Sequence, residues 1–106
     1  MKLETVYLKV HSTGARAGNR YVIAICDKDL IGKTIENKKY KINITERFYK
    51  GEEMEEDKVI KILKDANNVN IMGKKSVAIA LKSGVITEKN IIKIGKVLHA
   101  QSTSCI

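Results

Sequence analysis

The spacing of apolar residues changes near the middle of this chain, and that change constrains the fold more than any other feature. Up to residue 44 apolar side chains alternate with polar ones or run continuously, which predicts strands over 5–11 and 21–26 and a polar hairpin over 34–44. From Asp57 they recur every three or four residues, which predicts a helix. A second helix over 74–84, stopped by Gly84, and a strand over 91–100 complete the pattern.

This order of elements predicts an α+β fold, with a mixed or antiparallel sheet and two helices on one face. A chain of 106 residues is long enough for one modest core, so we expect a single small domain over 1–101 and a short C-terminal tail over 102–106. No apolar run approaches the ~20 residues that a membrane span needs. The start of the chain is too charged for a secretory signal. We therefore expect a cytoplasmic protein with no membrane contact.

Positive charge is concentrated in the C-terminal half of the chain. There are 20 basic and 12 acidic residues, a net charge of +8, and residues 58–106 hold nine of the basic residues but only two of the acidic ones. A basic surface attracts polyanions such as RNA. The alternative is compositional, because 17 of the 20 basic residues are lysine and proline is absent, a bias that an AT-rich genome produces on any protein surface. Charge alone leaves both interpretations open.

The loop "STGARAGNR" (12–20) is the first candidate contact with nucleic acid. Its glycines allow backbone N–H groups to turn toward an anion, and Arg16 and Arg20 carry the guanidinium groups that bind phosphate in a bidentate manner. The alternative is a hairpin loop that simply requires small residues. The loop matches neither glycine-rich nucleotide motif, which argues against a nucleotide hydrolase.

Two further sets of residues are candidates for the same role. Tyr7, Lys9 and His11 share one face of the first strand, where they form a base-stacking platform if that face is open and part of the core if a helix covers it. Lys74 and Lys75 begin the helix over 74–84, where their charge opposes the helix dipole. Such a conflict indicates either an anion-binding site or surface lysines that are merely tolerated.

The stretch "IGKVLHAQ" (94–101) places His99 and Gln101 on one face of the last strand. We interpret His99 first as a hydrogen-bonded structural residue, because a lone histidine near a chain end most often has that role, and second as a ligand contact. Acid–base catalysis is the third interpretation, because no partner for it can be identified from spacing. In the second interpretation a ligand cleft is lined by His99 and Gln101 together with Asn70, Gly73, Cys26 and Asp27.

No metal, cofactor or catalytic residue is expected. The spacing of His11, Cys26 and His99 resembles no known zinc site. Cys26 lies in an apolar strand, where burial raises the pKa of a thiol and makes it a poor nucleophile, whereas Cys105 is expected to be exposed. The acidic run 52–57 is interpreted as charge at the N-terminal turn of the first helix, and alternatively as a contact for a basic protein partner.

Several residues resemble those of an archaeal family known as domain of unknown function 424, over about residues 5–101. The matching landmarks are Cys26-Asp27, Leu30, Gly32-Lys33, Asn70, Gly73, Val77, Ala80 and His99-Ala100-Gln101. Members of that family tend to have proline before the terminal histidine, where this chain has Leu98. The resemblance implies an archaeal cytoplasmic protein of one α+β domain, with a loose connection to RNA or translation and no established activity.

The sequence supports three functional hypotheses. The leading one is a non-catalytic module that binds RNA or a ribonucleoprotein such as the ribosome, largely through the lysines of 58–96 and the loop 12–20. The second is a small ligand-binding protein or enzyme with a cleft around His99. The third is a protein–protein adaptor that uses the acidic segment 52–57.

Overall fold

The computed structural model describes residues 4–12 and 21–103 of the chain. The described strands and α-helices, in chain order, are β1 (Thr5–Ser12), β2 (Tyr21–Cys26), β3 (Thr34–Glu36), β4 (Lys41–Asn43), α1 (Glu46–Tyr49), β5 (Glu52–Glu55), α2 (Glu56–Leu63), β6 (Asn68–Met72), α3 (Lys74–Ser83), β7 (Ile91–Ile94) and β8 (Val97–Thr103). Two short 3-10 helices cover Lys28–Leu30 and Glu88–Asn90. The predicted contacts Arg16 and Arg20, and the predicted exposure of Cys105, lie outside the described residues.

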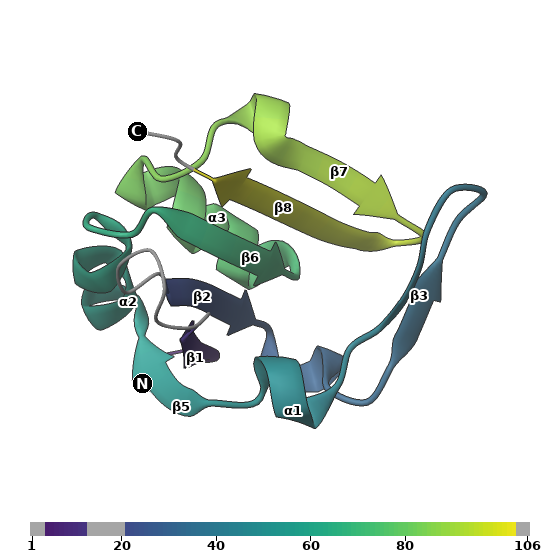
Figure 1. Ribbon diagram of the computed structural model, residues 1–106, viewed down its shortest axis with the longest axis horizontal. Helices are drawn as coiled ribbons and strands as arrows, with labels where there is room; N and C mark the ends of the chain where they lie inside the picture. The colour runs from purple at the N-terminus through teal and green to yellow at the C-terminus, as the bar shows by residue number, and fades with distance from the viewer. Residues whose placement is uncertain (1–3, 13–20, 104–106) are drawn as a thin grey trace.

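A six-stranded mixed sheet in the order β5-β1-β2-β6-β8-β7 forms the centre of the molecule (Figure 1). β2 and β6 are parallel, and the other neighbouring pairs in this sheet are antiparallel. β3 and β4 form a separate two-stranded hairpin. The α+β class and the mixed sheet predicted from the sequence are therefore confirmed.

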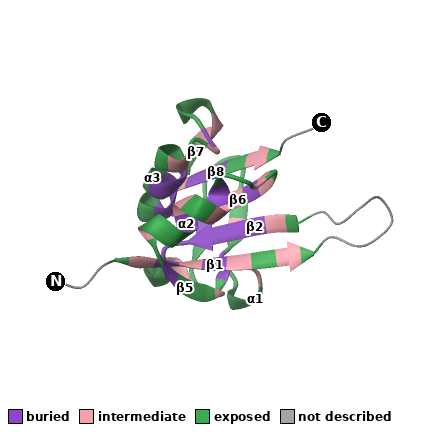
Figure 2. Cartoon of the chain, turned by 90° about the vertical axis from the view of Figure 1, so that its left-hand side faces the viewer, coloured by how far each residue is buried: buried purple, intermediate pink, exposed green. Residues whose placement is uncertain are grey.

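The two faces of the sheet are covered by different elements. On one face, α2 and α3 pack over alternate residues of the strands, including Val6, Ile25 and Ile71, and this confirms the two helices predicted on one face. The opposite face carries a second apolar cluster that includes Cys26, Ile44 and Tyr49, contributed by the sheet, the β3–β4 hairpin and α1. Buried residues accordingly gather along the middle of the sheet and on the inner sides of the helices (Figure 2).

The acidic segment 52–57 does not form a single helix N-terminus, so that prediction is wrong. Glu52–Glu55 is the edge strand β5, paired with β1, and only Glu56 and Asp57 lie in the first turn of α2. Met54 is buried between exposed glutamates, which is the alternation of a strand. A Cβ on Gly51 would lie 2.2 Å from the carbonyl oxygen of Leu8, so glycine at this position lets the two strands approach.

The strand predicted over 91–100 is also wrong, because it is two strands joined by a tight turn. β7 ends at Ile94 and β8 begins at Val97, and Gly95 between them has a φ of +63°. Glycine reaches this left-handed conformation without strain, which permits a two-residue hairpin. β8 continues to Thr103, past the expected start of the tail at 102.

No helix among the residues that the structure describes is long and apolar enough to span a membrane.

Candidate nucleic-acid interface

Tyr7, Lys9 and His11 share one face of β1 as predicted, but this face is not an open stacking platform. The short helix α1 lies over it, and the ring of His11 stacks on the ring of Phe48 at 4.5 Å with 14° between the planes. The Nε2–H of His11 also donates to the backbone carbonyl of Phe48 at 2.8 Å. The ring of His11 is therefore engaged within the protein, and the platform interpretation is wrong.

A hollow remains beside this contact. It has a volume of about 320 Å³ and is lined by Lys9, His11, Thr45, Arg47 and Phe48. The ammonium of Lys9 donates to the carbonyl of Arg47, which holds Lys9 against α1. Two cationic side chains at the rim of a polar hollow form a suitable contact for a phosphate. Lys9 therefore remains a candidate contact, and Arg47 joins it.

The N-terminus of α3, where Lys74 and Lys75 suggested an anion site, is occupied by a carboxylate of the protein itself. Asp27, only 7% exposed, accepts hydrogen bonds from the backbone N–H of Lys75 at 3.0 Å, the N–H of Ser76 at 2.8 Å and the hydroxyl of Ser76 at 2.7 Å. This buried anion satisfies the free N–H groups at the start of the helix and interacts favourably with its dipole. The lysines are therefore no evidence for an external anion at this position.

Gly73 and Asp27 form one structural unit, not the wall of a ligand cleft. Gly73 has a φ of +110°, and a Cβ at this position would lie 2.4 Å from the carboxyl carbon of Asp27. Only glycine combines this backbone conformation with that close approach. Both residues therefore serve the junction between β2, β6 and α3.

His99 and Cys26 are buried on the face of the sheet opposite α3. His99 is 5% exposed, and its Nδ1–H donates to the backbone carbonyl of Ile71 at 2.8 Å. Burial lowers the pKa of His99, partly offset by this hydrogen bond, so its ring is neutral at pH 7. Burial, together with the neighbouring charge of Asp27, raises the pKa of the Cys26 thiol to about 12. The first interpretation of His99, as a hydrogen-bonded structural residue, agrees with this geometry.

Asn70 and Gln101 are the two members of the predicted cleft that the structure brings together at the surface. They are directly opposite each other on β6 and β8, so their side chains share one face of the sheet. The hydroxyl of Tyr49 donates to Oδ1 of Asn70 at 2.7 Å, while Gln101 is exposed.

Five exposed lysines gather where the β3–β4 hairpin meets the β7–β8 turn. Asn37 Nδ2, at the tip of the first hairpin, donates to the carbonyl of Lys93 at 3.3 Å, and the backbone of Glu36 lies close to Gly95. The turn between β7 and β8 abuts the β3–β4 hairpin at one end of the molecule (Figure 1). We call the surface formed by these lysines the lysine junction: Lys38, Lys39, Lys41, Lys93 and Lys96.

The lysine junction combines high positive charge with an exposed aromatic ring. Tyr40 is 47% exposed between its lysines, and Glu36 is the one acidic residue in 36–41 and 92–97. Among the described residues, none of the five lysines takes part in a salt bridge. Sequence reasoning did not single out residues 38–41. The local signal was "NKKYK" (37–41), but its contact with residues 93–96 depends on tertiary structure.

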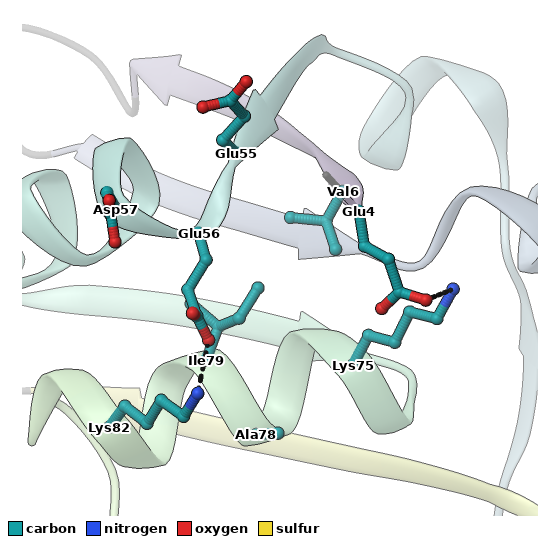
Figure 3. Close-up of a pocket in the computed structure, with 9 residues that line it drawn as sticks. All are labelled: Glu4, Val6, Glu55, Glu56, Asp57, Lys75, Ala78, Ile79 and Lys82. Atoms are coloured by element: carbon teal, nitrogen blue, oxygen red, sulfur yellow. Dashed lines mark hydrogen bonds and ion pairs between the residues drawn. The ribbon is translucent and has the colours of Figure 1, made fainter. Parts of the chain in front are cut away.

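A second hollow, of about 340 Å³, lies between β5, α2 and α3, and most of the charged side chains that line it are acidic. Its charged lining consists of Glu4, Glu55, Glu56, Asp57, Lys75 and Lys82. Across it, Lys75 reaches Glu4 at 3.3 Å and Lys82 reaches Glu56 at 2.7 Å (Figure 3). The four carboxylates outnumber the two ammonium groups, so this side of the molecule is locally negative.

Comparison with known proteins places the chain among relatives of unassigned activity. A crystal structure of an uncharacterized conserved protein from Methanopyrus kandleri is similar, with 28% sequence identity and a TM-score of 0.79, over 97% of this chain and 96% of that one. A search of curated proteins finds no significant match. A family model, described as protein of unknown function (DUF424), matches residues 15–104 and confirms the resemblance noted from the sequence. The chain therefore belongs to the family of domain of unknown function 424.

Proposed function

We propose that this protein is a non-catalytic module that binds RNA, free or within a ribonucleoprotein such as the ribosome, and that the lysine junction is its main contact surface. The observation that carries the proposal is the meeting of two lysine-bearing segments, 38–41 and 93–96, which are about 50 residues apart in sequence and together hold five exposed lysines and the exposed Tyr40. Lysines on a compact surface bind phosphates and release counterions, and an exposed tyrosine stacks on unpaired bases.

The compositional explanation of the charge makes a different prediction, and this difference can be tested. If lysines merely reflect genome composition, those on α2 should contribute to RNA binding as much as those of the junction. We therefore choose two triple variants with the same change of net charge. The first is Lys39→Ala, Lys93→Ala and Lys96→Ala. The control is Lys58→Ala, Lys61→Ala and Lys64→Ala, three exposed lysines on α2 and at its C-cap.

The measurement is the affinity for a labelled single-stranded RNA by fluorescence anisotropy, at several salt concentrations. Each phosphate contact contributes a slope of about −0.7 to the dependence of log K on log [salt], so the junction variant should reduce the magnitude of the slope by about 2. Its affinity at about 0.1 M salt should fall by tenfold to roughly a hundredfold. Equal losses in both variants, or no binding by the wild type at low salt, would contradict the proposal.

A second candidate function, contact with a basic protein partner, is favoured by the acidic hollow beside β5 and α2. Glu55 and Asp57 line this hollow, and neither takes part in a salt bridge among the described residues. The double variant Glu55→Lys and Asp57→Lys should abolish such a contact in a pull-down from host lysate. The same variant should leave RNA affinity unchanged or increase it, because it adds positive charge.

A further inference from the structure

The face of the sheet that carries α1 also carries three polar side chains in one cross-strand row, on either side of the buried Ala24. Paired residues of neighbouring strands point to the same side, so Lys9, Ala24, Asn70 and Gln101 form one row across β1, β2, β6 and β8. At one end of this row, Lys9 and Arg47 line the basic hollow. At the other end, β8 leads back from Gln101 to Lys96 of the lysine junction, a distance of about 17 Å at 3.3 to 3.4 Å per residue.

Asn70 is held in one orientation by Tyr49. The Tyr49 side chain is 4% exposed, and its hydroxyl finds its acceptor in Oδ1 of Asn70 at 2.7 Å. Burial, and then the nearby Cys26, raises the pKa of Tyr49 well above its ordinary value, so the hydroxyl stays protonated and can only donate to this oxygen. The amide is therefore oriented with its nitrogen, a double donor, directed away from Tyr49.

Gln101 supplies an adaptable partner next to this fixed amide. It is exposed and stands directly opposite Asn70, at the separation of about 5 Å that cross-strand pairs have. His99, two residues before Gln101 on β8, is paired with Ile92 on β7. The side chain of Ile92 is 40% exposed and adds an apolar surface on the same face of the sheet. Fixed and adaptable amides beside an apolar contact provide both the hydrogen bonds and the packing surface that a flat heterocycle requires.

We propose that Asn70 and Gln101 bind the edge of an unpaired nucleobase, with Tyr49 as the residue that positions Asn70. Side-chain amides hydrogen-bond base edges, and in RNA these edges are accessible in single strands and not in duplexes. The cations on the two sides of the row, Lys9 and Arg47 in the hollow and the lysine junction beyond β8, are placed to contact the flanking phosphates. This inference rests on the proposed RNA binding and adds to it a base-reading site.

The test measures the affinities of the four single-stranded homopolymers of RNA, and of a duplex, at one salt concentration. Gln101→Ala removes an exposed side chain, and Asn67→Ala is the matched control, an exposed amide outside the row. We expect the wild type to prefer single strands and one base, and Gln101→Ala to lose about tenfold for that base. The salt dependence should not change, because no charge is removed. Tyr49→Phe should lose the preference as well, since Asn70 is then free to rotate.

The outcomes separate this inference from the proposed function. If Gln101→Ala and Tyr49→Phe bind all homopolymers as the wild type does, while the junction variant binds weakly, RNA binding stands and the base-reading site is wrong. A preference for duplex over single strands would also overturn it. If the wild type binds no RNA at low salt, both proposals fail. The folded state of each variant is checked by thermal unfolding, and Gln101→Ala provides the decision if Tyr49→Phe is unstable.

Discussion

Replacing Asp27 by asparagine should weaken the junction between β2 and α3. Asparagine retains one oxygen for Ser76, but it places an NH₂ group opposite the N–H of Lys75, where the carboxylate now accepts a bond at 3.0 Å. A donor then faces a donor at a partly buried contact. The variant also loses the negative charge that interacts with the N-terminus of α3.

The expected cost follows from these contacts. An unsatisfied buried N–H costs about 1 to 3 kcal/mol, and the lost charge at the helix start costs about 0.3 to 1 kcal/mol more. We therefore expect the free energy of unfolding to fall by about 3 kcal/mol, a large fraction of the ~5 to 15 kcal/mol typical of a domain. For a chain of this size the melting temperature should fall by roughly 12 to 24 °C.

The assay is urea and thermal unfolding followed by circular dichroism, with Asp29→Asn as the matched control. Asp29 lies two residues further along, is exposed and undergoes the same chemical change, so its variant should stay within about 0.5 kcal/mol of the wild type. Equal unfolding midpoints for the two variants would refute the reasoning, because the Asp27 carboxylate would then not be the cap that holds α3.

Three further predictions follow from buried groups and close contacts. Because burial lowers the pKa of His99, the unfolded chain takes up a proton at higher pH than the folded protein. The free energy of unfolding should therefore decrease as the pH falls below about 6.5. Urea titrations at several pH values will measure this decrease, which should be smaller in His99→Gln. In a Cys105→Ser variant, Cys26 should resist alkylation at pH 8 until the protein unfolds, because burial raises the pKa of its thiol to about 12. Mass spectrometry measures the alkylation, and rapid labelling of the native protein would contradict this prediction. Gly51→Ala should lower the free energy of unfolding by about 2 kcal/mol or more, because its Cβ would lie 2.2 Å from a carbonyl oxygen of β1, and an unchanged urea midpoint would show that β5 can shift without cost.

Sequence reasoning succeeded where the periodicity of one segment decides its structure. The strands over 5–11 and 21–26 and the helix over 74–84 are found close to their predicted bounds. It failed at 52–57, where five carboxylates suggested a helix start and concealed the alternation around Met54. That segment becomes a strand because the open edge of β1 offers backbone hydrogen bonds to it.

In the candidate site, too, some residues were predicted correctly from the sequence and others were misplaced. Asn70 and Gln101 were identified as members of one cleft, and strand register makes them neighbours. Asp27 and Gly73 were placed in that cleft too, but they form the cap of α3. The platform of Tyr7, Lys9 and His11 failed because α1, a helix of four residues, is too short to have a periodicity of its own.

The sequence by itself determined the α+β class, the burial of the apolar faces and the excess of positive charge, because these depend on composition and on local spacing. Only the tertiary structure decided which charged residues lie together. Lys39 and Lys96 are 57 residues apart and belong to one surface because two hairpins pack together, and Tyr49 orients Asn70 from another element. Contacts of this kind depend on how the layers stack and on strand register, and no local pattern of residues encodes them.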